Sequence, residues 1–111
     1  MSDNSRLNQL MGMFENTPND CFLLFAIAKE YERKGEVKES LNFYQKIIEI
    51  DTNYSGVYYH LGKLLEAMNE KAKALAIYKQ GIEVTTQLGD QHARSELQNA
   101  KMNLEMEDLL S

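Results

Sequence analysis

The chain repeats itself with a period of 34 residues, and this period limits its fold more than any other feature. Residues 21–54 align with residues 55–88 without a gap and share eight identities. The identical pairs are Lys29/Lys63, Glu32/Glu66, Glu36/Glu70, Leu41/Leu75, Tyr44/Tyr78, Ile48/Ile82, Glu49/Glu83 and Thr52/Thr86. A repeat of this length is one supersecondary unit that cannot bury its apolar face alone, so the period predicts a stacked array.

The same register extends beyond the two full copies. Upstream, Leu7, Asn8, Glu15 and Asn19 match Leu41, Asn42, Glu49 and Asn53 one period later. Downstream, residues 89–111 begin in phase and then diverge, as expected for a terminal helix with one neighbour. We therefore expect a single domain over residues 1–111, made of a half repeat (5–20), repeats at 21–54 and 55–88, and a capping helix (89–111).

Each repeat has the apolar spacing of two helices. Leu24, Ile27, Ala28 and Tyr31 recur three and four residues apart, which is the helical pattern. The single Pro and six isolated Gly leave long segments uninterrupted. The predicted helices are 5–15, 20–34, 37–50, 54–68, 71–86 and 90–108, which makes the fold all-α. Gly35 and Asn69 lie between the paired helices, where a left-handed backbone ends the first helix.

Small and large side chains recur in phase within this pattern. Ala28 and Gly62 are one pair of small residues and Ser40 and Ala74 are another, as close helix crossings require. Large residues lie between them, namely Tyr31, Tyr44, Tyr58 and Tyr78. Together with the 34-residue period, this pattern resembles the tetratricopeptide repeat, in particular the short stand-alone proteins of bacteria. The departures are Asn69 for the usual Gly and Gly81 for the usual Ala.

This resemblance implies an α-α superhelix of antiparallel helix pairs with a concave groove. Family members use the groove to hold a peptide or helix of another protein, so the expected function is a non-catalytic interaction module. The eight groove residues implied by position are Phe22, Phe25, Lys29, Arg33, Tyr59, His60, Lys63 and Arg94. The inward faces that would line the groove also include Ala26, Glu66, Ala93 and Leu97. They form an aromatic and basic stripe, which favours a protein partner of acidic character.

One subset of the family clamps the acidic C-terminal tails of heat-shock chaperones through Lys, Asn and Arg side chains. The corresponding positions here hold Phe25, Lys29, His60, Asp90 and Arg94, and only Arg94 agrees. Recognition of chaperone tails in that way is therefore not expected.

Charge and cysteine content exclude other classes of protein. The net charge of −5 has the wrong sign for general nucleic-acid binding. The longest apolar run covers residues 21–28, too short to cross a membrane, and the first residues lack the pattern of a signal peptide. A single cysteine allows no internal disulfide and fits a reducing compartment, so we expect a cytoplasmic protein.

No motif for catalysis or metal binding is present. His60 and His92 are the only histidines, and neither lies three or four residues from a second His or a Cys. Cys21 has no nearby His to activate it. The six glycines are isolated, so no phosphate-binding loop forms. We expect no enzyme activity, no cofactor and no metal.

Self-assembly is the alternative to a partner protein. The last helix carries an apolar stripe whose portion from Leu104 to Leu110 is expected to project beyond what one helix pair buries. Together with Leu10 and Phe14 of the first helix, Leu104 and Leu109 would then form a homodimer.

Overall fold

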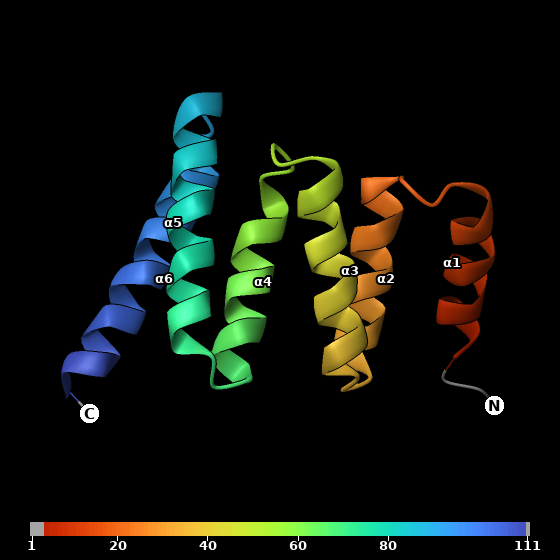
Figure 1. The fold of residues 1–111 in the computed structure, drawn as a ribbon, viewed down its shortest axis with the longest axis horizontal. Helices are drawn as coiled ribbons and strands as arrows, with labels where there is room; N and C mark the ends of the chain where they lie inside the picture. The colour runs from red at the N-terminus through yellow and green to blue at the C-terminus, as the bar shows by residue number, and fades with distance from the viewer. Residues whose placement is uncertain (1–3, 111) are drawn as a thin grey trace. The chain divides into compact units, whose positions relative to one another are not determined.

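The computed structural model describes residues 4–110 and has six α-helices (Figure 1). They are α1 (Ser5–Asn16), α2 (Cys21–Arg33), α3 (Val37–Ile50), α4 (Gly56–Ala67), α5 (Lys71–Leu88) and α6 (Gln91–Leu110). All six predicted helices are present, with ends that differ by at most two residues, and they pack in antiparallel pairs. Residues 1–3 and 111, the ends of the expected domain, lie outside the described part.

The helix ends follow local chemistry. Asp20 precedes α2, and its side chain accepts a hydrogen bond from the backbone N–H of Leu23 at 3.2 Å. The predicted left-handed positions are confirmed, with φ of 80° at Gly35 and 62° at Asn69. Gly89 ends α5 with φ of 73°. Asn is one of the few residues that tolerate this backbone conformation, which explains its presence where the family has Gly.

The chain divides into two compact units, Met1–Tyr54 and Ser55–Ser111, and each is described by itself. In the first unit, α2 packs against both α1 and α3. Its core contains Leu7, Leu23 and Ile27, and the half-buried residues Leu10, Met11, Phe14, Tyr31 and Phe43 pack on them. The ring of Phe43 stacks on Tyr31 with centroids 5.8 Å apart and meets Phe14 edge-on at 5.5 Å. These aromatic contacts hold α1 on the helix pair.

In the second unit, α5 packs between α4 and α6, and α6 also contacts α4. The small residues permit these crossings. A Cβ on Gly62 would lie 2.1 Å from Cε1 of Tyr78, and one on Gly81 would lie 2.6 Å from Cβ of Tyr58 and 2.9 Å from Cδ1 of Leu97. The departure from the family pattern at Gly81 therefore has a steric cause, because Tyr58 and Leu97 leave no volume for a side chain.

One hydrogen bond between paired helices occurs in both units. The hydroxyl of Tyr44 on α3 donates to Glu32 on α2 at 2.7 Å, and Tyr78 on α5 donates to Glu66 on α4. Both pairs are among the identities that recur with the 34-residue period. Burial and, second, the hydrogen bond to the carboxylate raise the pKa of each tyrosine well above its usual value.

Candidate functional site

The eight predicted groove residues lie on three helices of the two units. Helix α2 of the first unit carries Phe22, Phe25, Lys29 and Arg33. In the second unit, α4 carries Tyr59, His60 and Lys63, and α6 carries Arg94. That these residues combine into one groove stays a prediction. Each helix surface belongs to its own unit.

The aromatic residues of α2 differ in exposure. The side chain of Phe22 is 77% exposed, the most open aromatic among the described residues. Phe25, one turn further along α2, is half-buried, with its ring centroid 5.9 Å from that of Tyr44 and 6.0 Å from that of Tyr54. Phe25 is thus packed against its neighbours, whereas the ring of Phe22 is exposed.

Charged side chains of both signs surround Lys29 on α2. The buried carboxylate of Glu30 accepts two hydrogen bonds from Arg33, the shorter 2.8 Å long, and lies 3.3 Å from Nε of Arg6 on α1. The hydrogen bond from Arg33 is the main reason that the pKa of Glu30 lies below its usual value. A hollow of about 480 Å³ beside them is lined by Lys29, Glu30, Glu32 and Arg33.

On α4 the predicted residues form local contacts. The rings of Tyr59 and His60 meet edge-on at 5.7 Å. Nζ of Lys63 lies 3.8 Å from the Glu66 carboxylate that also accepts the hydroxyl of Tyr78. Glu66 therefore joins two helices of the fold in addition to lying beside the predicted site.

The residues predicted on the capping helix differ in exposure. Arg94 is exposed on the first turns of α6. Leu97 is 1% exposed and packs at Gly81, so its placement in the groove was wrong: it fills the space that the missing side chain leaves. Asp90, one of the positions compared with the chaperone-tail clamp, accepts hydrogen bonds from the N–H of Ala93 and from Ser55, both at 3.2 Å. It caps α6.

The predicted surfaces of α2 and α4 each carry aromatic side chains with charges of both signs and are not uniformly basic. The pairs Arg33–Glu30 and Lys63–Glu66 are three residues apart, a spacing that brings side chains together on one helix face and is readable from the sequence. The burial of Glu30 beneath Arg6 and Arg33 was not predicted. The available signal was the alignment itself, which places Glu30 opposite Leu64 of the second repeat, a buried apolar position.

Cys21 lies at the start of α2 and is half-buried. Burial raises the pKa of its thiol, and the carboxylates of Asp51 and Asp20 raise it further. A raised pKa disfavours the reactive thiolate. Among residues 4–110, no group of three or more His, Cys, Asp or Glu side chains is arranged to hold a metal ion.

The residues expected at a homodimer interface mostly pack inside their own units. Leu104 is 1% exposed, and Leu10 and Phe14 pack on the core of the first unit. The expectation that α6 projects from Leu104 onward was therefore wrong for Leu104. Nζ of Lys71, at the start of α5, lies 3.7 Å from Asp108, so α6 stays beside α5 almost to its end. Leu109 is 85% exposed.

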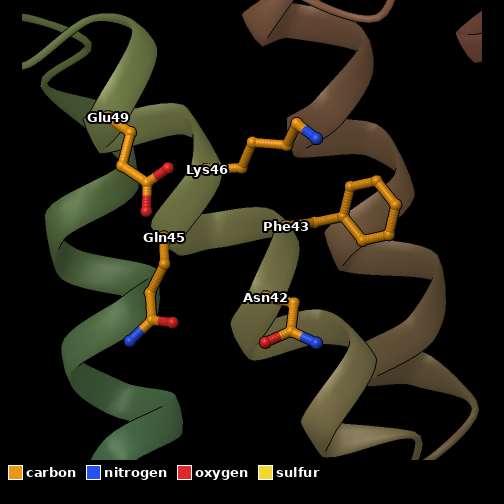
Figure 2. A pocket seen from close by; sticks show the side chains of 5 residues that line it. All are labelled: Asn42, Phe43, Gln45, Lys46 and Glu49. Carbon is orange, nitrogen blue, oxygen red and sulfur yellow. The ribbon is translucent and has the colours of Figure 1, made fainter.

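A further hollow of about 290 Å³ lies on α3 and is lined by Asn42, Phe43, Gln45, Lys46 and Glu49. Figure 2 shows Phe43 and Lys46 reaching to one side of the helix and Gln45 and Glu49 to the other. Nζ of Lys46 lies 5.6 Å from the centroid of the Phe14 ring, a cation–π contact. All five residues come from one helix, α3.

Within the described residues, no helix combines the length and the apolar content that crossing a bilayer requires.

Comparison with known proteins identifies the family. Residues 7–104 match the family described as the RNPP family C-terminal domain. A TPR repeat-containing protein from Pseudomonas aeruginosa is 28% identical over 79 residues, which cover 71% of this chain and 75% of that protein.

Solved structures agree in fold. A tetratricopeptide repeat domain protein from Salinibacter ruber is 40% identical, with a TM-score of 0.77 over 79% of this chain and 89% of that chain. The TPR2B domain of yeast Sti1, solved in a complex with pHsp70, is 17% identical, with a TM-score of 0.81 over 88% of this chain and 78% of that chain. The last likeness concerns the fold alone. The chain therefore belongs to the tetratricopeptide-repeat proteins and, over residues 7–104, to the RNPP family C-terminal domain.

Proposed function

We propose that this protein is an interaction module that holds a segment of a partner protein against the exposed side chains of α2 and α4, without catalysing a reaction. The single observation that carries the proposal is the exposure of Phe22, 77%, beside the fixed ring of Phe25. Tetratricopeptide-repeat domains are protein-interaction modules and are typically non-catalytic. The yeast domain with the same fold was solved in a complex with pHsp70.

The energetics suit a contact anchored by aromatic side chains. An aromatic side chain that loses its exposed surface on binding contributes about 2 kcal/mol or more, at about 25 cal/mol per Å². Phe22 is the main anchor, and Phe25 on α2 and Tyr59 on α4 add further aromatic surface, each on its own helix. Lys29, Lys63 and Arg94 face a carboxylate-bearing segment and set its orientation rather than most of its affinity, because exposed ion pairs contribute little.

The partner can be identified by crosslinking from within the proposed surface. A photoreactive amino acid in place of Phe22 should crosslink a protein from a lysate, and the same replacement at Met13, an exposed apolar residue of α1, should not capture it. The captured protein is then purified and titrated calorimetrically. We expect Phe22→Ser with Tyr59→Ala to weaken binding at least about tenfold, and Met13→Ser to leave it unchanged. The proposal would be contradicted if the captured protein bound the original protein, the double variant and Met13→Ser with equal affinity.

Self-assembly through the terminal helices remains the alternative function. Three of its four expected residues are engaged inside their own units, which leaves Leu109 as the exposed one. Sedimentation velocity distinguishes the two functions: a monomer at all accessible concentrations excludes the dimer, whereas a dimer abolished by Leu109→Gln supports it.

A further inference from the structure

Helix α6 has a buried apolar face, and in its second half the opposite face is apolar as well. Leu97, Ala100 and Leu104 are buried on one face. The other face is polar along the first half of the helix, at Gln91, Ser95 and Gln98, and becomes apolar in the second half. There Met102 and Met106 are each 52% exposed and Leu109 is 85% exposed. Their spacing of four and three residues places them in one stripe along the helix, and Leu110, 84% exposed, lies beside it.

A hollow adjoins the start of this stripe. It measures about 380 Å³ and lies between α5 and α6, lined by Lys79, Ile82, Gln98, Lys101, Met102 and Glu105. Ile82 and Met102 are its apolar lining residues. Met102 belongs to both the hollow and the stripe. Methionine is flexible and polarizable, and this lets such a surface adapt to the side chains of a partner.

Helix α6 is acidic along the stripe, and the neighbouring α5 adds Lys79 at the hollow and Lys71 near the end of α6. Residues 96–110 contain one ammonium group, Lys101, and four carboxylates, at Glu96, Glu105, Glu107 and Asp108. Lys101 lies 3.1 Å from Glu105, and Asp108 pairs with Lys71 on α5. Glu96 and Glu107 are exposed in addition to these pairs. An apolar stripe with acidic edges complements an amphipathic helix whose edges carry Lys or Arg.

A second copy of the chain fits this surface poorly. It would bring the same acidic edges against each other, and like charges in contact are unfavourable. The four exposed apolar side chains also offer only on the order of 300–400 Å², about half of the roughly 800 Å² per partner that a stable interface buries. We therefore propose that the outer face of Met102, Met106, Leu109 and Leu110 is a second interaction surface, and that it binds a basic amphipathic helix of another protein.

The probe for this surface is a synthetic peptide of about 16 residues, roughly 24 Å long as a helix. It carries Leu at positions i, i+3, i+4 and i+7 with Lys at the flanking positions. A second peptide keeps the Leu residues and replaces each Lys by Glu. Fluorescence anisotropy with the full chain should show that the Lys peptide binds at least about tenfold more tightly than the Glu peptide, with an affinity that falls as salt is added.

Variants place the binding on α6 and separate it from the proposed function. Met106→Gln with Leu109→Gln changes only exposed positions and should weaken the Lys peptide at least about tenfold. Met13→Gln and Phe22→Ser, exposed positions on other helices, should leave its affinity unchanged. Equal binding of both peptides, unchanged binding by the α6 variant, or a dimer in sedimentation that the α6 variant abolishes would each overturn the proposal.

Discussion

The contact between Gly62 and Tyr78 gives the sharpest test of the packing. A Cβ at Gly62 would lie 2.1 Å from Cε1 of Tyr78 and 2.7 Å from both Cδ1 and Cζ. Carbon atoms in contact are about 3.5 Å or more apart, so Gly62→Ala requires a shift of roughly 1.4 Å. The ring cannot turn away easily, because Tyr78 is fully buried and its hydroxyl is held by Glu66.

The expected magnitude follows from two opposing effects. Overpacking of a well-packed crossing costs about 1–3 kcal/mol, and replacing Gly by Ala in a helix returns up to about 1 kcal/mol. We expect Gly62→Ala to lower the free energy of unfolding by about 1–2 kcal/mol, measured by urea denaturation followed by circular dichroism. Gly12→Ala is the matched control. Apart from its chain neighbours and the backbone of its own helix, a Cβ at Gly12 would meet nothing within 4 Å, so this change should stabilise α1 by about 0.5–1 kcal/mol.

A double variant attributes the loss to the ring. In a Tyr78→Leu background the atoms nearest to the new methyl group are removed, so Gly62→Ala should become neutral or stabilising there. The packing argument is refuted if Gly62→Ala stabilises the original protein as much as Gly12→Ala does.

Three further predictions concern buried groups. Because the pKa of Tyr78 is raised in the fold, its contribution to stability is complete below the usual value of 10.0. As the pH rises above that value, the contribution is lost, and the free energy of unfolding falls with pH. Tyr78→Phe should reduce this alkaline slope by up to about 1.4 kcal/mol per pH unit, measured by denaturation at several pH values. Because the pKa of Glu30 is lowered, its contribution to stability is present above the usual value of 4.5 and is lost as the pH falls through the lowered pKa. The acid-side slope of stability against pH should therefore be shallower in Glu30→Gln than in the original protein. Ala74→Leu should lower the free energy of unfolding by more than about 2 kcal/mol, because Ala74 is fully buried in the α4–α5 pair. An unchanged melting temperature in this variant would show that the crossing is loosely packed.

Most of the fold follows from the order of residues. The 34-residue period and the three- and four-residue apolar spacing defined six helices, because a repeated helix pair must stack in phase to bury its apolar faces. Gly35 and Asn69 marked left-handed turns because few residue types adopt positive φ. These features depend on local chemistry, which the order of residues encodes directly.

Tertiary structure decided which side chains remain available for binding. Leu97 and Arg94 lie three residues apart on the same helix, but Leu97 is buried and Arg94 is exposed. Only the packing of Leu97 against Gly81 shows that Leu97 belongs to the core. Likewise, Glu66 has the character of a surface carboxylate in the sequence, yet it holds the hydroxyl of Tyr78 on the neighbouring helix. Exposure and hydrogen bonding across helices depend on neighbours distant in the chain, so periodicity alone could not assign them.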